Sequence, residues 1–181
     1  MAVQFYDSRQ NADFNPVNFF SFFTNVCNIF GDAVFLIVAF GIVRSPHGRD
    51  VVRGAATLYL TIVGVVFSIL LANLESILIP WVNAIVHYIM PIAVVVDWCV
   101  DPPSTTITRA DVGRWLILPI VYLAYAMVRG AFVHWYPYPF MNADVLGCGV
   151  IPYLLAIIGF TLLVSWVLVA LGRRLGGSAR A

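Results

Sequence analysis

The sequence contains no lysine, and all ten of its basic residues are arginine. This absence excludes chemistry that depends on a lysine amine, such as a retinal or pyridoxal Schiff base or the phosphate-binding lysine of a P-loop. Charge of either sign is scarce, since charged residues make up 10% of the 181 residues. Soluble domains carry roughly a quarter. The net charge of +1 gives no indication of a nucleic-acid partner, and we expect none.

Cysteine is also rare. Cys27, Cys99 and Cys148 are far apart in the chain, form no CxxC pair, and lie in or beside apolar runs. We expect them to behave as small apolar residues rather than as metal ligands or redox groups. The sequence therefore indicates no metal site and no organic cofactor.

Hydrophobic residues make up 61% of the chain, and its mean hydropathy is +0.91. Nineteen charged residues are too few to solvate the exterior of a soluble protein of this size. In a bilayer, an apolar exterior is what the solvent requires, and helices satisfy their own backbone polar groups. The sequence therefore predicts an all-α fold, a polytopic transmembrane helix bundle.

Five apolar runs approach or exceed the roughly 20 residues that a helix needs to cross the bilayer core. They are residues 19–43, 54–74, 76–96, 115–128 and 145–172. Pro80 is expected to mark the start of the third helix, because proline suits the first turn. The fourth run is short, and we expect its helix to extend back to Val112 and past Arg129, whose long side chain can reach the interface.

The connecting segments complete the predicted organisation. Residues 44–53 are expected to form a polar loop, and Thr108 with Asp111 is expected to form a capping box for the fourth helix. The Tyr-Pro repeats within residues 134–144 are incompatible with a regular helix, and their aromatic residues suit the membrane interface. We thus expect an extracytoplasmic segment at residues 1–18, a bundle at 19–173 and a cytoplasmic tail at 174–181.

The arginines indicate the orientation of the bundle. With five spans, eight of them fall on one side, in the first loop, the third loop and the C-terminal tail, whereas Arg9 and Arg129 fall on the other. The positive-inside rule then predicts a multi-pass protein of the plasma or inner membrane with a cytoplasmic C-terminus. A polar start outside the membrane is unusual, and we expect that a preceding helix is missing from this chain.

Polar residues inside the apolar runs are the candidates for a functional site, because they are costly in lipid. Thr24, Asn28 and Asp32 are spaced four apart and share one face of the first helix, and Asn83 and His87 share a face of the third. With a rise of 1.5 Å per residue, Thr24 lies about 8 Å and His87 about 13 Å from the same membrane surface.

A hydroxyl and an imidazole at similar depth can perform nucleophilic chemistry, since the histidine can take the threonine proton during attack on an acyl carbon. We therefore expect Thr24 and His87 to line one shared cavity. The amides of Asn25, Asn28 and Asn83 are candidates to bind the substrate, by stabilising an oxyanion or orienting the histidine. The structural alternative is that these groups bond to their own helix or tie helices together.

Two other functions remain open at this point. Asp32 is a candidate proton-relay or cation-binding carboxylate, or a partner for a polar group on another helix. A small proton- or ion-coupled transporter centred on Asp32 and His87 is therefore one alternative to a hydrolase. A non-catalytic membrane scaffold or subunit is the other.

Several of these residues occur in motifs that resemble a known family. The sequence is similar to the androgen-induced and androgen-dependent membrane proteins of vertebrates and their small bacterial relatives, over residues 19 to 170. The matching pieces are Phe22-Phe23-Thr24-Asn25, Asn83 and His87 before Pro91, Asp97-Trp98, Arg129-Gly130, and Trp135-Tyr136-Pro137-Tyr138-Pro139-Phe140.

This resemblance implies a fold and an activity. The family has six membrane helices, one more than the five expected here, and its vertebrate members are threonine hydrolases that cleave fatty acid esters of hydroxy fatty acids. Thr24 matches the nucleophile and His87 the catalytic histidine. The resemblance therefore implies that the partners are membrane lipids and a fatty-acid ester substrate.

Overall fold

A computed structural model describes residues 2–10, 14–72 and 79–178, and every regular element among them is helical. Four helical stretches are long and apolar enough to cross a membrane: Pro46–Leu71, Pro80–Val100, Arg109–Val133 and Ala143–Gly176. The apolar helix α3 (Phe23–Ala39) is shorter, with 17 residues. The prediction of an all-α bundle of membrane-spanning helices is confirmed.

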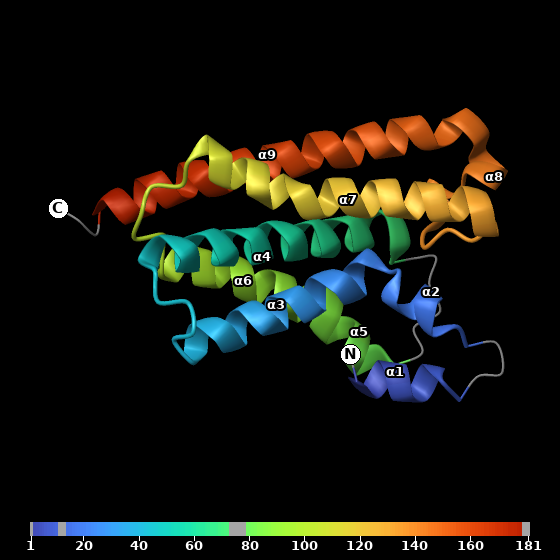
Figure 1. The fold of residues 1–181 in the computed structure, drawn as a ribbon, viewed down its shortest axis with the longest axis horizontal. Coiled ribbons are helices and arrows are strands. Elements are labelled where there is room, and N and C mark those ends of the chain that lie inside the picture. The colour runs from blue at the N-terminus through green and yellow to red at the C-terminus, as the bar shows by residue number, and fades with distance from the viewer. Residues whose placement is uncertain (1, 11–13, 73–78, 179–181) are drawn as a thin grey trace.

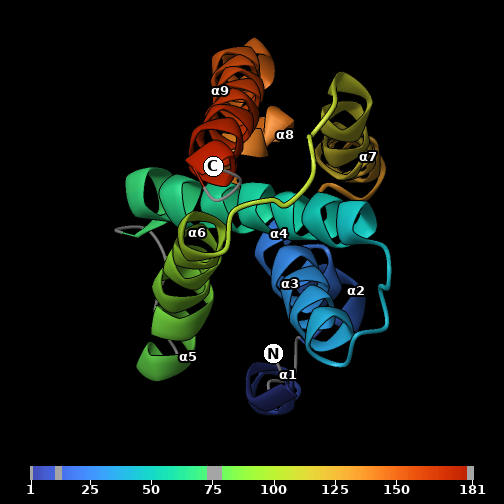
Figure 2. The same cartoon turned by 90° about the vertical axis from the view of Figure 1, so that its left-hand side faces the viewer.

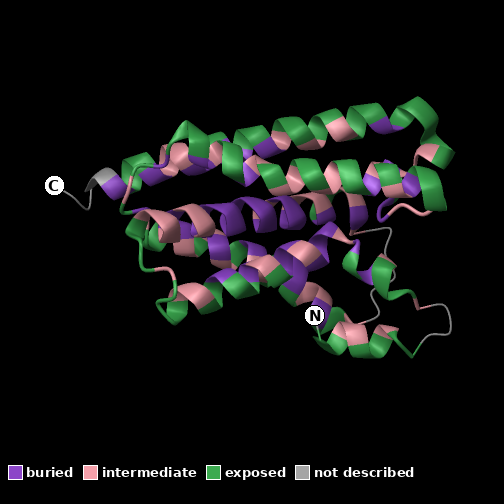
Figure 3. Cartoon of the chain, viewed as in Figure 1, coloured by how far each residue is buried: buried purple, intermediate pink, exposed green. Residues whose placement is uncertain are grey.

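Helix α4 (Pro46–Val66), continued by the π-helical turn η1 (Phe67–Leu71), lies at the centre of the bundle. Viewed end-on in Figure 2, α7 (Arg109–Val133) and α9 (Val150–Ser178) lie on one side of it, and α3 and α6 (Met90–Val100) lie on the other. The apolar window of α4 is 67% buried, compared with 11% for α7 and 22% for α9. The outer helices α7 and α9 are largely exposed (Figure 3), and many of their exposed residues are apolar, as a lipid environment requires.

The third span is not a uniform helix. It runs from α5 (Pro80–Ala84) through the π-helical turn η2 (Ile85–Ile89) into α6. Pro80 starts it, as predicted. Pro91 explains the π turn, because proline has no N–H and its ring would collide with the carbonyl of His87 in an α-helix. Gly64 lets α4 approach this point, since a Cβ there would lie 2.8 Å from Cβ of Pro91.

The prediction of one helix over residues 19–43 was wrong. After α1 (Ala2–Ser8), the chain forms α2 (Pro16–Phe20), breaks, and starts α3 at Phe23. Asn15 caps α2 by accepting from the N–H of Val17 at 2.8 Å. The Nδ2 of Asn25 donates to the carbonyl of Phe19 at 2.7 Å across the break. These two local side-chain bonds stabilise a break inside an apolar run, and α2 already begins within the predicted 1–18 segment.

The prediction of a polar loop over residues 44–53 was also wrong, because α4 begins at Pro46. The Oγ of Ser45 caps the helix by accepting from the N–H of Gly48 at 3.2 Å. Asp50 and Arg53 are then buried within the helix, at 0% and 5% exposure. Asp50 and Arg53 can be buried in a helix because residues from a distant part of the chain bind their charged groups.

Those partners lie in and after the last turn of α6. The Oδ2 of Asp50 accepts from the N–H of Thr105 at 2.8 Å. Arg53 pairs with Asp97 at 2.8 Å and with Asp101 at 3.0 Å. The segment that joins α6 to α7 is therefore fastened to the first turns of α4.

Other boundaries agree with the sequence. Thr108 and Asp111 form the expected capping box of α7, whose bounds extend beyond both Val112 and Arg129. The segment after His134 contains η3 (Pro139–Met141), α8 (Ala143–Leu146) and η4 (Gly147–Gly149), and no long helix. Helix α9 continues to Ser178, so the predicted tail at 174–181 is helical up to that residue. Glu75, expected between two spans, lies outside the described residues.

The arginine-bearing regions gather at one end of the bundle, the left end in Figure 1. Thr105 contacts Asp50 at the start of α4, and Pro103 packs on Gly172 near the end of α9. The first loop, the third loop and the end of α9 therefore share one side, as the topology prediction requires.

Candidate functional site

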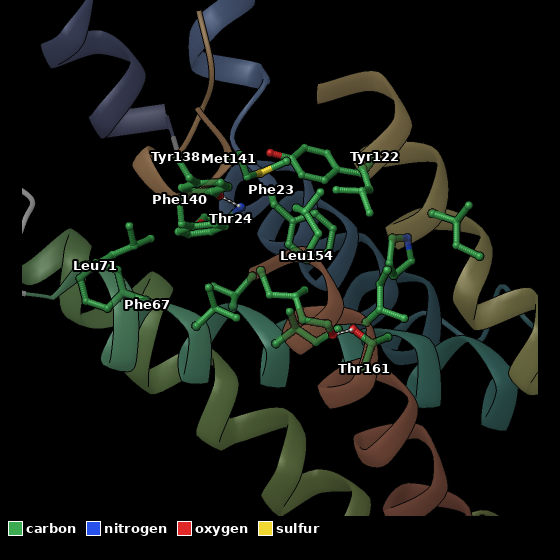
Figure 4. A pocket seen from close by; sticks show the side chains of 18 of the residues that line it. Phe23, Thr24, Phe67, Leu71, Tyr122, Tyr138, Phe140, Met141, Leu154 and Thr161 are labelled. Atoms are coloured by element: carbon green, nitrogen blue, oxygen red, sulfur yellow. Dashed lines mark hydrogen bonds between the residues drawn. The ribbon is translucent and has the colours of Figure 1, made fainter. Parts of the chain in front are cut away.

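A cavity of about 360 Å³ lies between α3, α4, α7 and α9 and is bounded by residues 138–141 (Figure 4). Most of the side chains around it are apolar, among them Phe67, Leu123, Phe140, Met141, Leu154 and Ile157. Its polar residues are Thr24, Tyr122, Tyr138 and Thr161. The cavity is thus suited to an apolar ligand with a polar group at the start of α3.

Thr24 lies in the first turn of α3, where helical N–H groups have no partner within the helix. Its N–H donates instead to the hydroxyl of Tyr138 at 3.3 Å. Its own hydroxyl has no hydrogen-bond partner among the described residues. Threonines deeper in a helix bond to the carbonyl four residues back, as Thr161 does to Ile157 at 2.8 Å. For Thr24 that carbonyl belongs to Phe20, beyond the break, so the hydroxyl is left to the cavity.

His87 lies in the π turn η2 and is 8% exposed. Its Nδ1 is 2.8 Å from Oδ1 of Asn83. Because Oδ1 can only accept, Nδ1 carries the proton and Nε2 is left as the basic nitrogen. The imidazole stacks on the ring of Phe67, with centroids 3.7 Å apart and planes at 13°. It also lines a second, more open cavity between α4 and the η2–α6 span.

Thr24 and His87 do not share a cavity, contrary to the sequence expectation. No hydrogen bond joins them within the part of the chain that the structure describes. They are linked through Phe67, which lines the cavity of Thr24 and stacks on His87. Asn28 adds a second link, because its Nδ2 donates to the carbonyl of Thr24 at 2.9 Å and to that of Val86 at 3.3 Å. The two candidate residues are therefore connected only indirectly, through the ring of Phe67 and the amide of Asn28.

The three asparagines named from the sequence have distinct positions. Asn25 bonds to the backbone of Phe19 across the α2–α3 break, and Asn28 joins α3 to η2, so their amide donors are engaged with carbonyls. Asn83 orients His87. In this arrangement the asparagines hold the backbone and the imidazole in place.

Asp32 lies exposed on α3. No hydrogen bond or ion pair joins its carboxylate to another residue of the described ranges. The partner expected on another helix is therefore not found among these residues, and Asp32 does not line the cavity that contains His87.

Sequence reasoning missed the aromatic residues that complete the cavity. Tyr138 and Phe140 were expected at the interface, but they turn inward with their rings stacked, 5.2 Å apart at 5°. Gly130 permits this fold-back, since a Cβ there would lie 2.1 Å from the ring of Tyr136. The available signal was the pairing of Gly130 with a Tyr-Pro segment that cannot be helical.

Two tyrosines of α7 also hold the α2–α3 junction. The hydroxyl of Tyr122 donates to the carbonyl of Ser21 at 3.0 Å, and the hydroxyl of Tyr125 lies 2.7 Å from Oγ of Ser21. These contacts fix the start of α3, and with it Thr24, against the wall of the cavity.

Comparison with known proteins adds no relative. Neither a protein-family model nor a curated protein nor a solved structure matches this chain. The resemblance to the androgen-induced and androgen-dependent membrane proteins therefore stays a hypothesis that rests on the motifs quoted above.

Proposed function

We propose that this protein is an integral membrane hydrolase that cleaves a lipid ester, with Thr24 as nucleophile and His87 as general base. The observation that carries the proposal is the position of Thr24, whose hydroxyl lines a largely apolar cavity and has no hydrogen-bond partner among the residues that the structure describes. An acyl chain matches the walls, and an ester carbonyl at its end would lie at the start of α3.

The reaction follows the course of other hydroxyl nucleophiles. Oγ1 of Thr24 forms a bond to the ester carbonyl carbon while its proton passes to Nε2 of His87. The tetrahedral intermediate then breaks its bond to the alcohol, which leaves with that proton. Water attacks the acyl-threonine by the same route, and the fatty acid is released. No oxidant, reductant or further co-reactant is needed.

The proposal requires a movement of Phe67, because its ring covers the imidazole in the ligand-free arrangement. Contacts between catalytic groups are often long without substrate and tighten on binding. Phe67 begins the π turn η1 and His87 lies in the π turn η2, and such turns are frequent at functional sites. Because Nδ1 of His87 donates to Oδ1 of Asn83, Nε2 is already left as the acceptor that the mechanism uses.

The two alternatives from the sequence lack a supporting contact. A transporter would bring Asp32 and His87 to one polar path, yet Asp32 is exposed and lies outside the cavity of His87. A non-catalytic scaffold would not explain why the hydroxyl of Thr24 lines the cavity. Both alternatives predict no ester cleavage that depends on Thr24.

The test uses purified protein in lipid nanodiscs, a long-chain acyl ester with a chromogenic alcohol, and a fluorophosphonate probe. We expect Thr24→Ala to abolish both turnover and labelling, Thr24→Ser to keep part of each, and His87→Ala to slow turnover roughly 10²- to 10⁴-fold. Thr161→Ala is the matched control, because Thr161 lines the same cavity but donates its hydroxyl to a helix carbonyl. Equal labelling of wild type and Thr24→Ala would refute the proposal.

The orientation is part of the same proposal. We infer that the arginine-rich end faces the cytoplasm of a cell whose plasma or inner membrane holds the protein, and that the α8 end faces outward. The start of α3, which carries Thr24, lies toward the α8 end (Figure 1), so the substrate would come from the outer leaflet.

A further inference from the structure

A third pocket, more polar than the other two, lies at the opposite end of the bundle from Thr24. Its volume is about 130 Å³, and it lies between the α6–α7 connection and the last turns of α9. Thr105, Thr106 and Arg173 supply its polar groups, and Ile107 and Val169 its apolar wall. The pocket therefore joins hydrogen-bond donors to apolar surface.

Hydrogen-bond donors are in excess at this pocket. The backbone N–H groups of Thr106 and Ile107 have no hydrogen-bond partner within the described ranges, and Arg173 has no acidic partner there. The side chains of Thr106 and Arg173 are exposed. The connection is held close to α9 because Gly172 and Gly176 have no side chains, and a Cβ at either would lie 2.7 Å from Pro103. Backbone and side-chain donors on a fixed connection are suited to an anion.

The charges around the pocket also favour an anion. The four acidic residues at this end are already engaged: Asp97 and Asp101 with Arg53, Asp111 with Arg114, and Asp50 with Ser104 and Thr105. Four exposed arginines have no ion pair with any described residue. They are Arg44, Arg109, Arg173 and Arg174. This end therefore has a net positive charge that its own acidic residues do not neutralise.

We propose that this pocket binds the phosphate group of an anionic phospholipid. Arg173 and the donors of Thr106 would bind the phosphate, and the acyl chains would follow the outward face of α9. That face is apolar before Arg173, with Leu163 at 55% and Trp166 at 69% exposure. A free phosphate ion could use the same donors but would leave this apolar face uncovered. The site does not depend on ester hydrolysis at Thr24.

The test is native mass spectrometry of purified protein with phosphatidylglycerol, phosphatidylcholine or inorganic phosphate. We expect phosphatidylglycerol to be retained in preference to phosphatidylcholine. Arg173→Gln should weaken its binding at least about fivefold, the effect of removing one arginine contact with an anionic lipid. Thr106→Val should also weaken it. Arg174→Gln is the matched control, because Arg174 is also exposed but does not line the pocket, and it should change binding less than about twofold.

Three outcomes would overturn the proposal. Equal losses in Arg173→Gln and Arg174→Gln would show diffuse attraction to the arginine-rich end. Equal retention of phosphatidylcholine would remove the role of net charge. Inorganic phosphate that binds as tightly as phosphatidylglycerol would identify a free anion as the ligand. Size-exclusion profiles that match wild type establish that each variant remains folded, so a weakened signal reports binding.

Discussion

The contact between Gly54 of α4 and Trp115 of α7 offers a sharp test of how the bundle is packed. A Cβ at Gly54 would lie 2.2 Å from Cζ2 of Trp115, whereas ordinary contacts begin at 3.4 Å. The indole cannot easily yield, because it is 1% exposed and its Nε1 donates to the carbonyl of Val51 at 2.8 Å. The carbonyl of Trp115 also accepts from the hydroxyl of Tyr59 at 2.8 Å.

We therefore expect Gly54→Ala to destabilise the protein. Relieving the overlap requires a shift of 1.2 Å, the difference between 3.4 and 2.2 Å, in a residue held by one side-chain and one backbone hydrogen bond. Overpacking of this kind costs about 1–3 kcal/mol. Alanine in place of glycine returns up to about 1 kcal/mol of helix propensity. With the full propensity gain subtracted, the net loss should be about 0–2 kcal/mol in the free energy of unfolding.

The measurement is reversible unfolding in mixed micelles, followed by tryptophan fluorescence and helical circular dichroism. Gly113→Ala is the control, because a Cβ at Gly113 meets nothing within 4 Å, and it should be neutral or slightly stabilising. In a Trp115→Phe background the smaller ring should remove most of the cost of Gly54→Ala, giving a clear coupling energy. If Gly54→Ala matched Gly113→Ala, or cost the same in both backgrounds, the packing argument would be wrong.

Two further predictions concern the charged end and the orientation. Arg53 is 5% exposed, whereas the side chains of Asp97 and Asp101 are 38% and 59% exposed. Removing both carboxylates by Asp97→Asn and Asp101→Asn leaves a buried cation and should lower the free energy of unfolding by about 3–5 kcal/mol. Arg53→Met should cost less, because the two carboxylates that lose their partner are exposed and can be hydrated. A larger loss in Arg53→Met than in the double variant would contradict this. In a cysteine-free background, a membrane-impermeant maleimide should label Asn142→Cys but not Thr106→Cys on intact cells, and labelling of Thr106→Cys alone would invert the proposed orientation.

The sequence was sufficient for the class of fold because the bilayer itself imposes the pattern. A span needs about 20 apolar residues whatever its neighbours are, so composition and run length predict its existence. Local signals were reliable where their chemistry is local. Pro80 starts its helix, and the Thr108–Asp111 capping box is completed within four residues.

The boundaries that failed depend on contacts between distant parts of the chain. Asp50 and Arg53 looked like loop residues because burial of a charge is costly without a partner. Their partners, Thr105 and Asp97 with Asp101, lie more than 40 residues away, and no local pattern predicts the pairing. Charge position is therefore a poor guide to helix ends wherever a polar connection folds back over a helix.

The geometry of the candidate site also depends on contacts that the sequence does not predict. The helix rise gives the depth of Thr24 and His87 in the membrane, and the four-residue spacing gives the face of each helix, but neither gives the rotation of one helix against another. That rotation depends on Gly64 and Pro91, which bring α4 against the third span, and on the π turn that Pro91 favours. The ring of Phe67 then covers His87 at the wall of the cavity of Thr24. Whether Thr24 and His87 act together therefore depends on a movement of the Phe67 ring. No polar motif in the sequence identifies Phe67.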